Sequence, residues 1–293
     1  MTGDKLYELF SLLYNKELSD LFSEFKLEIR KQLPDSIIKL LPVSYNNNDL
    51  LEELYQAEFK KINVNNRMVL LDSFANLDLK VGLGAATSTS AQTPSQKLQL
   101  WGLEATSKAQ GLAKRVLGYG HESIAEQART TFGMMCSMVT YHQQIRHRLS
   151  ENHREKLESL ILDSDRDVCL PPTIKESIFK EDFLSLVRQF KKFRIYLYKK
   201  YNLDKILPFL LNCDQIKLII ATNARIDIEM LAERICRNAQ WEIRELSTKK
   251  LKQLRELSNI LYEKALPSCV YGKCKEGKLT CGKQQQMRKE WRS

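Results

Sequence analysis

Two segments with strand character interrupt a sequence whose apolar residues otherwise recur mostly at helical spacing. Residues 128–136 alternate between two faces, with Thr130, Phe132 and Met134 on one face and Thr131, Gly133 and Met135 on the other. Residues 216–222 form the short apolar run Ile-Lys-Leu-Ile-Ile-Ala-Thr, which is typical of a strand. Because helical segments lie before, between and after these strands, the sequence predicts an α+β fold and not a doubly wound sheet.

The other periodic segments are predicted as helices. Apolar residues at three- and four-residue steps predict helices over residues 1–65, 95–117 and 137–149, one or two long helices over 226–266, and a basic amphipathic helix over 176–201. The polar residues 150–175 are predicted as a loop that ends at Pro171-Pro172. We expect a helical extension over residues 1–75, a domain over 76–268 and a basic, cysteine-containing tail over 269–293. The extension carries no recognisable chemistry and is interpreted as a docking arm or as the relic of a duplicated copy.

The charge of the chain favours anionic partners. Of the 293 residues, 46 are basic and 36 are acidic, and the formal net charge is +10. Part of this excess lies in the tail, where Lys273, Lys275, Lys278, Lys283, Arg288, Lys289 and Arg292 face Glu276 and Glu290. A basic tail is more often a solvated terminus than a nucleic-acid site, so nucleic acid is not an expected partner.

The sequence also bears on cellular location. No apolar run approaches the roughly 20 residues needed to cross a bilayer, so no membrane partner is expected. The first residues, Met-Thr-Gly-Asp-Lys, lack the apolar core of a signal peptide. We therefore expect a cytoplasmic protein whose seven cysteines are reduced thiols or metal ligands.

Basic and amide side chains gather in two clusters, and each cluster follows a predicted strand. The first cluster holds three of the four histidines and consists of His142, Gln143, Gln144, Arg146, His147, Arg148, Asn152, His153 and Arg154. The second consists of Asn223, Arg225, Arg234, Arg237, Asn238 and Gln240. Arginine suits phosphate oxygens, so the clusters indicate a site for an anionic ligand. The alternative is a surface network of ion pairs with acids such as Glu229 and Glu233.

Motifs for several other chemistries are absent. His142 and His147 are five residues apart and do not share a helical face well, and no H-E-x-x-H zinc motif is present. The sequence contains no G-x-S-x-G hydrolase motif and no Walker motif. The glycines within residues 81–93 do not fit the dinucleotide-binding fingerprint. Their small neighbours instead predict a close approach of this backbone to an opposing segment.

Three cysteines of the tail have the surroundings of a metal knuckle. Cys269, Cys274 and Cys281 are interleaved with glycines, whose tight turns let thiolates point toward one ion, here zinc. The spacing is not that of a C-x₂-C pair, and no fourth ligand is close in sequence, although Cys213 could supply one. The alternative is a reduced, cysteine-rich tail. Cys136 and Cys236 are predicted to be core thiols.

Several motifs in one order resemble the flavin-dependent thymidylate synthases. Residues 120–127 resemble the family's G-H-[ED]-[ST]-x-x-E-H segment, and residues 143–148 resemble its helix end, Q-x-x-R-H-R. Asn223-Ala224-Arg225, Arg234 and residues 239–243 are similar to the later N-A-R-S-L…R…H-A-Q-x-E-I segment. Residues 85–89 stand where the family carries an A-A-R-x-S strand. The resemblance covers about residues 80–268.

The resemblance implies a fold, a cofactor and a reaction. The fold would be a mixed sheet with long helices that assembles as a homotetramer, with FAD bound between subunits. The reaction would be the reductive methylation of dUMP to dTMP, with methylenetetrahydrofolate as carbon donor and NADPH as reductant. The flavin would carry the hydride, and the protein would supply position and charge.

The same resemblance implies site residues. Those for FAD are His121, Ser123, Glu126, Arg146, His147, Arg148, Asn223 and Arg225. Those for the nucleotide are Gln143, Arg146 and Arg234, with folate as an alternative ligand for Arg234.

No catalytic residue is assigned, because the family's active-site serine and following arginine have no counterpart here. In one alignment their positions hold Lys156 and Glu158, and in the other they hold Glu155 and Leu157. The chain also departs from the family pattern at Gln127, Glu229 and Asn238.

These departures leave three interpretations open. The first is a thymidylate synthase with a rebuilt loop, and the second is a flavoenzyme that acts on another nucleotide or on a nucleic-acid base. The third is a non-catalytic paralogue, or half of a duplicated enzyme, that scaffolds an active partner. Bound FAD would separate the first two interpretations from the third.

Overall fold

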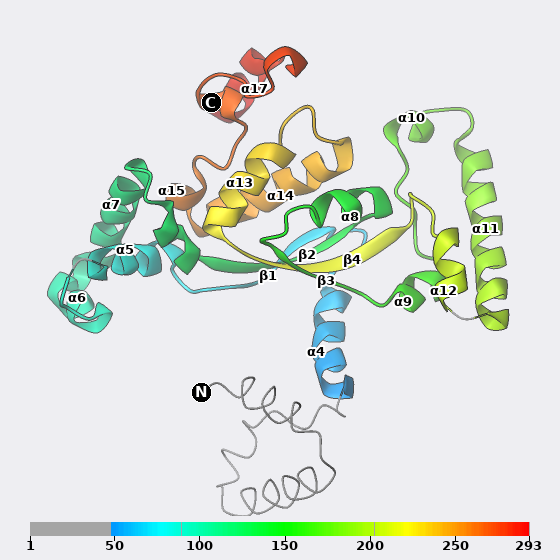
Figure 1. The fold of residues 1–293 in the computed structure, drawn as a ribbon, viewed down its shortest axis with the longest axis horizontal. Helices are drawn as coiled ribbons and strands as arrows, with labels where there is room; N and C mark the ends of the chain where they lie inside the picture. Colours follow the sequence, from blue (N-terminus) through cyan, green and yellow to red (C-terminus); the bar gives the residue numbers. More distant parts are fainter. Residues whose placement is uncertain (1–47, 89, 202, 293) are drawn as a thin grey trace, which may run out of the picture. The chain divides into compact units, whose positions relative to one another are not determined.

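A four-stranded antiparallel sheet organises the residues that this computed structural model describes, which are 48–88, 90–201 and 203–292 (Figure 1). Across the sheet the strands are β1 (Met68–Ser73), β2 (Arg129–Ser137), β4 (Gln215–Asn223) and β3 (Glu151–Arg154). The central pair, β2 and β4, corresponds to the two predicted strands and runs from Arg129 opposite Asn223 to Ser137 opposite Gln215. The predicted α+β class is confirmed.

The structure differs from the sequence-based prediction in two places, at the end of α8 (Met138–Gln144) and in the segment that contains β3. The helix predicted over residues 137–149 ends at Gln144, because the chain turns through residues 145–150 to bring β3 alongside β4. The loop predicted over 150–175 contains β3 and the helices α9 (Leu157–Leu162) and α10 (Pro172–Lys175). β3 reads Glu-Asn-His-Arg at the sheet edge, so it lacks the apolar alternation that identifies a strand.

The two faces of β2 enter two different apolar clusters, as the alternation predicts. One face, with Phe132 and Met134, belongs to the main core. The other face carries Met135, which packs with Phe59 and Ile62 at the end of α4 (Asn48–Lys61). On this second face, a Cβ on Gly133 would lie 2.5 Å from the Ile62 side chain, so only glycine allows this packing.

Helix α4 also bears on the predicted helical extension. The helix predicted over residues 1–65 is confirmed over residues 48–61, and residues 1–47 lie outside the described part. Contacts divide the chain between Tyr55 and Gln56, and the sheet belongs to the second unit. No described helix is both long and apolar enough to span a membrane.

Helices α13 (Ala224–Arg234) and α14 (Trp241–Leu257) cover the main-core face of the sheet (Figure 1). Leu231 of α13 and Leu246, Leu251 and Leu254 of α14 are all fully buried there. The span predicted as helical over 226–266 is therefore divided at residues 235–240 and continues into α15 (Asn259–Tyr262).

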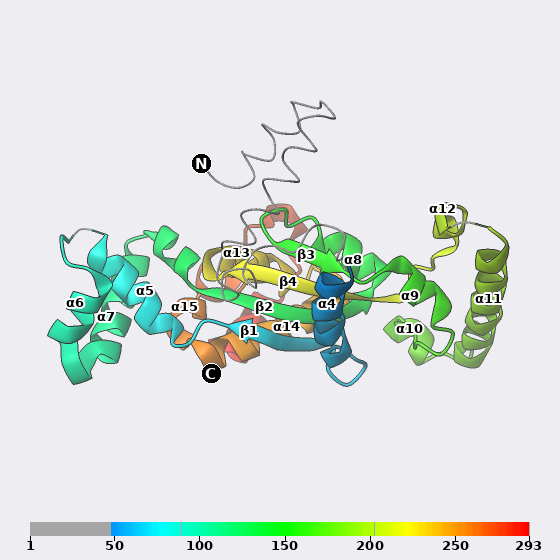
Figure 2. The same cartoon turned by 90° about the horizontal axis from the view of Figure 1, so that it is seen from below.

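Helices α5 (Leu77–Thr87), α6 (Pro94–Trp101) and α7 (Ala105–Gly118) gather at one end of the sheet (Figure 2). A Cβ on Gly82 of α5 would lie 2.4 Å from the carbonyl oxygen of Ala109 on α7. This contact confirms the close backbone approach predicted for residues 81–93. The strand placed at 85–89 by the resemblance is wrong, because residues 85–87 are the end of α5, whose start is capped by Asn76.

The opposite end of the sheet carries α11 (Lys180–Lys200) and α12 (Leu203–Ile206) (Figure 2). The first of these confirms the amphipathic helix predicted over 176–201. The C-terminal residues form α16 (Ser268–Tyr271) and α17 (Gln284–Arg292), and Met287 of α17 is buried in the main core. The 3₁₀ turns are η1 (Gly102–Glu104), η2 (Glu122–Gln127), η3 (Leu207–Phe209) and η4 (Gly277–Leu279).

Candidate functional site

The turn between α8 and β3 carries the first group of predicted site residues. His147 N–H donates to the Gln144 carbonyl and Ser150 N–H to the His147 carbonyl, each over 3.1 Å, and these bonds hold the turn. Arg146 and Arg148 on the turn are exposed, whereas the His147 side chain is only 17% exposed. The turn therefore presents guanidinium groups to solvent around a largely buried imidazole.

Arg234, from the last turn of α13, joins this group. Its Nη2 donates to the Gln143 carbonyl over 3.2 Å. Burial lowers the pKa of Arg234 against the opposing effect of Glu233, and the charge of Arg146 lowers it further. The fold thus brings together Gln143, Arg146, His147 and Arg234. Within this group the positive charges of Arg146 and Arg234 repel each other.

His147 feels the same electrostatic environment. Burial is the largest cause that lowers the pKa of this imidazole, and the neighbouring charge of Arg234 adds to it. The Glu233 carboxylate acts in the opposite direction from 3.9 Å, between its Oε2 and His147 Nε2. Of the alternative network of ion pairs, the described residues show this one long contact of Glu233 in the first cluster, whereas Arg225 and Arg237 of the second cluster pair with Glu126 and Glu290.

Two buried nitrogens of this group, His147 Nε2 and Arg234 Nε, have no hydrogen-bond partner. Buried polar groups in folded proteins are nearly always hydrogen-bonded. Two neighbouring buried nitrogens without a partner therefore indicate that a hydrogen-bond acceptor binds between them. An anion with several oxygens would accept from these groups and would offset the repulsion between Arg146 and Arg234. The residues present therefore fit a phosphate-bearing ligand.

The second group of predicted site residues lies at the start of α13 and on η2. The Arg225 guanidinium pairs with the Glu126 carboxylate over 2.5 Å, and about half of each side chain is exposed. The Asn223 side chain caps α13 by accepting from Ile226 N–H over 3.1 Å. His121 and Ser123 are exposed beside Glu126 on the same segment.

The two groups are separated along α13. Arg225 and Arg234 are nine residues apart on this helix, which corresponds to about 14 Å along its axis. One group therefore gathers around Arg234 and the α8–β3 turn, and the other around Arg225 and η2. Arg148 lies on the α8–β3 turn and so belongs to the first group, but its side chain is exposed to solvent.

The segment after β3, where the serine and arginine were expected, has a structural role. Glu155 is buried and accepts from Arg166 Nη2 over 3.0 Å and from Lys217 N–H over 2.7 Å. Leu157 packs against the main core, and Lys156 precedes the first turn of α9, which contains Glu158. The Glu155 carboxylate is thus fully occupied and is not a free nucleophile. Sequence reasoning missed Arg166, because it lies in a polar stretch without any motif.

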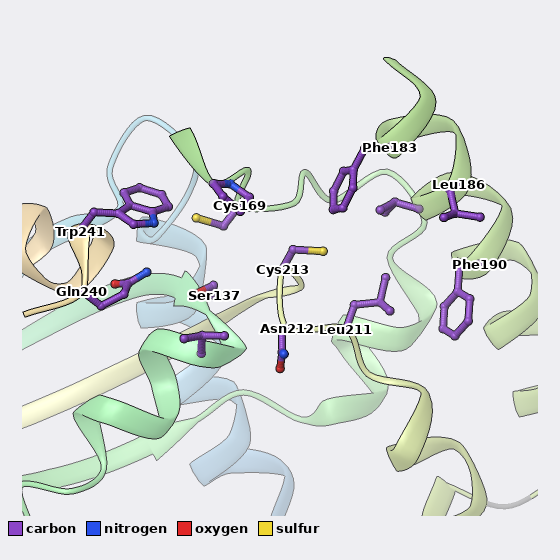
Figure 3. Close-up of a pocket in the computed structure, with 13 residues that line it drawn as sticks. Ser137, Cys169, Phe183, Leu186, Phe190, Leu211, Asn212, Cys213, Gln240 and Trp241 are labelled. Carbon is purple, nitrogen blue, oxygen red and sulfur yellow. The ribbon is translucent and has the colours of Figure 1, made fainter. Parts of the chain in front are cut away.

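A cavity of about 740 Å³ lies between α11 and the end of β2 (Figure 3). Its lining is mostly apolar and holds Ser137, Val139, Cys169, Pro171, Phe183, Leu186, Val187, Phe190, Leu211, Asn212, Cys213, Gln240 and Trp241. The absence of Lys, Arg and His from this lining makes the cavity unsuitable for a phosphate. Anion binding is therefore assigned to the α8–β3 turn.

The cysteine predictions have a mixed outcome. Within the part of the chain that the structure describes, no group of three or more His, Cys, Asp or Glu side chains has metal-binding geometry as it stands. Cys213 lines the cavity beside α11, and its charged neighbours are Asp214, Lys191 and Arg194, so it does not join the tail cysteines. Cys136 is fully buried as predicted, whereas Cys236 is only partly buried.

Comparisons with known proteins agree on one family. A family model described as thymidylate synthase complementing protein matches residues 70–258. The flavin-dependent thymidylate synthase of Clostridium tetani is 30% identical over 198 residues, which are 59% of this chain and 77% of that protein. That of Thermococcus kodakarensis is 36% identical over 176 residues, which are 56% of this chain and 72% of that protein.

A solved structure extends this likeness to the fold. The flavin-dependent thymidylate synthase of Helicobacter pylori, described as complexed with FAD and dUMP, matches with a TM-score of 0.53. The match covers 68% of this chain and 99% of the other, at 17% sequence identity. At this identity the likeness concerns the fold.

Proposed function

The chain belongs to the thymidylate synthase complementing protein family, the flavin-dependent thymidylate synthases, and we propose on this premise that it binds FAD and converts dUMP to dTMP by reductive methylation. The observation that carries the proposal is the group of Arg146, His147 and Arg234, in which the like charges of the two arginines interact and two buried nitrogens, His147 Nε2 and Arg234 Nε, have no hydrogen-bond partner. FAD and dUMP both carry phosphates that such a group can hold.

The proposed roles follow from where each side chain stands. Arg234 is fixed by its bond to the Gln143 carbonyl, so its guanidinium is oriented before a nucleotide phosphate arrives. Arg146 and Arg148 are exposed and can close on a phosphate from the solvent side. His147 is favoured as a neutral imidazole near pH 7 by its lowered pKa and can donate or accept one hydrogen bond. Bound flavin supplies the hydride chemistry.

The second group of residues leads to a proposed assembly. Arg225 lies about 14 Å along α13 from Arg234, and His121 and Ser123 are exposed on the η2 segment that Arg225 contacts through Glu126, so one chain offers two separate ligand-facing surfaces. We infer that FAD lies between subunits of a homotetramer, where the η2 group of one subunit meets the turn group of another. Exposed apolar side chains such as Leu100 and Leu103 provide surface for such contacts.

The proposal also includes methylenetetrahydrofolate as carbon donor, NADPH as reductant and a cytoplasmic location.

The other two interpretations of the sequence, a different flavoenzyme and a non-catalytic scaffold, are not favoured, since the matched relatives share one name. The replacement of the family's active-site serine by Glu155 in one alignment does not weaken the proposal. Nucleotide anchoring is assigned to Arg146, Arg234 and Gln143, and none of these is altered.

The test is a flavin spectrum of the purified full chain, followed by titration with dUMP. We expect the absorption bands of bound FAD, a change of these bands on addition of dUMP, and dTMP formation when methylenetetrahydrofolate and NADPH are present. A colourless protein that takes up no FAD would overturn the proposal. Bound FAD whose spectrum ignores dUMP would instead indicate another nucleotide substrate.

A further inference from the structure

Four cysteines converge where the C-terminal residues fold back over the end of α13. Cys236 follows this helix, Cys269 belongs to α16, and Cys274 and Cys281 lie in the segment between α16 and α17. Cys269 lies close enough to interact electrostatically with the other three thiols, those of Cys236, Cys274 and Cys281. Cys236 interacts in the same way with Cys274 and Cys281. The remaining described cysteines do not belong to this set of neighbours.

Polar contacts hold the segment against the residues that follow α13. Asn238 Nδ2 donates to the Leu279 carbonyl over 2.8 Å, and Arg237 pairs with Glu290 over 2.7 Å. These contacts place Leu279 and Glu290 beside the residues that directly follow Cys236.

The segment between α16 and α17 lacks an apolar core of its own. From residue 271 to residue 286, every residue is exposed except Cys274, Cys281 and Gln284. Its one large aliphatic side chain, Leu279, is 77% exposed. Ordering these residues costs backbone entropy, and here almost no apolar burial offsets that cost. Another source of order is needed, and the two cysteines are among the few residues that face inward.

The backbone around these cysteines makes the turns that a metal knuckle needs. Gly277, three residues after Cys274, has φ 54°, and Gly282, directly after Cys281, has φ 71°. Glycine adopts this left-handed conformation without the steric cost that other residues meet. The turns redirect the chain after each cysteine, so that both thiols can face Cys236 and Cys269.

We propose that Cys236, Cys269, Cys274 and Cys281 bind one zinc ion as a structural four-thiolate site. Zinc in structural sites prefers four tetrahedral ligands, and four thiolates are a common set. Such a site carries net charge −2, and Lys273, Lys275 and Lys278 of the same segment offset it. The structural role is to anchor α17, whose Met287 completes the main core.

Zinc binding requires the four sulfurs to close to about 3.8 Å from one another, given a Zn–S distance of roughly 2.3 Å in a tetrahedron. The described thiols do not yet have this geometry. Cys274 and Cys281 are partly buried on a segment whose other residues are mostly exposed, so a small shift of this segment can bring their sulfurs to Cys269 and Cys236. The fourth ligand is thus Cys236, for which the sequence predicts a core thiol, and not Cys213, which lies beside α11.

The test uses the full chain, purified under reducing conditions without chelator. We expect one equivalent of zinc by elemental analysis, and cobalt substitution should give thiolate-to-cobalt charge transfer with strong tetrahedral bands. Cys236→Ser should lose the bound zinc and this spectrum. Cys213→Ser is the matched control, because it removes a thiol outside the group and should keep both.

Three outcomes would overturn the proposal. They are zinc-free wild-type protein that gives no cobalt spectrum, a Cys236→Ser variant that binds zinc like wild type, or disulfide bonds among the four cysteines under the same conditions. Should Cys236→Ser fail to fold, chelator treatment of wild-type protein replaces it. Removal of zinc should then increase proteolysis at the lysines of residues 273–283, and unchanged proteolysis would count against the site.

Discussion

Charged side chains are arranged in opposite ways beneath the sheet and at the α8–β3 turn. Beneath the sheet, Lys250 and Asp227 are 2% and 0% exposed, and their Nζ and Oδ1 atoms are 2.7 Å apart. Thr222 Oγ1 donates to the same carboxylate over 3.0 Å, and the ammonium also lies 5.0 Å from the centre of the Phe132 ring. Each charge in this region therefore has a buried partner of opposite sign.

A second pair, whose carboxylate is buried, follows the same rule. Glu242 is fully buried, pairs with Arg67 and accepts from Thr140 Oγ1 over 2.6 Å. At the turn, by contrast, the like charges of Arg146 and Arg234 lie close enough to interact, and the Glu233 carboxylate comes no closer than 3.9 Å to His147. The difference indicates that paired, buried charges stabilise the fold, whereas the uncompensated charges of the turn are available for a ligand.

The largest effect is expected from breaking a buried pair. Asp227→Asn leaves the Lys250 ammonium buried without a counter-charge, and such a loss typically costs about 3–5 kcal/mol. Urea unfolding of the wild type and the variant measures the difference in free energy of unfolding. Glu245→Gln is the matched control, because it breaks an exposed i,i+4 pair with Lys249 that is worth only about 0.3–0.5 kcal/mol.

A double variant separates a stranded charge from general damage. Asp227→Asn combined with Lys250→Met removes both charges, so it should recover much of the stability lost in the single variant. If Asp227→Asn costs no more than Glu245→Gln, the contrast between buried and exposed charges fails.

How far the sequence predicts this molecule depends on how local each signal is. The strands β2 and β4 were predictable because alternation and apolar runs are carried by consecutive residues. β3 was not, because its four polar residues become a strand only by pairing with β4. The helix at residues 85–87 replaced an expected strand because Asn76 caps α5 and Gly82 packs on α7.

The candidate site shows the same division. The sequence indicated Arg146, His147 and Arg234 through their motifs, and the fold brings them together. It could not indicate that Arg166, eleven residues beyond Glu155, occupies the carboxylate at the expected serine position. That partnership depends on where the chain returns after α9, which no local pattern encodes.

An intermediate effect is expected from removing an uncompensated charge. Arg146 is exposed, and no hydrogen bond or ion pair of its side chain is found within the described residues, so Arg146→Ala should change stability by less than about 0.5 kcal/mol. Its affinity for dUMP should nevertheless fall roughly 10- to 100-fold, because charge-assisted hydrogen bonds contribute about 1.5–3 kcal/mol. Titration followed by flavin absorbance and urea unfolding measure the two quantities.

The control for Arg146→Ala is Arg188→Ala, which removes the same charge from the exposed surface of α11. It changes the net charge equally, so any loss of affinity from long-range attraction alone would occur in both variants. Equal affinities in the two variants would show that Arg146 does not contact the nucleotide. A large loss of stability in Arg146→Ala would instead place it with the buried, paired charges.

The smallest effect is expected from the titration of His147. Burial and Arg234 lower the pKa of this imidazole in the folded protein, so the unfolded chain binds its proton at higher pH than the folded chain does. The contribution of His147 to stability is therefore fully present above the unfolded pKa of about 6.5 and is lost as the pH falls toward the folded pKa.

Unfolding of wild type and His147→Gln across this pH range isolates the contribution of His147, because the other titrating groups are common to both proteins. The stability of the wild type should fall more steeply with acid than that of the variant. A bound phosphate should reverse this trend, since an anion beside His147 favours the protonated imidazole and so binds more tightly as the pH falls. If inorganic phosphate leaves the acid sensitivity of the wild type unchanged, the anion does not lie beside His147, and the division between paired and available charges must be redrawn around Arg146 and Arg234 alone.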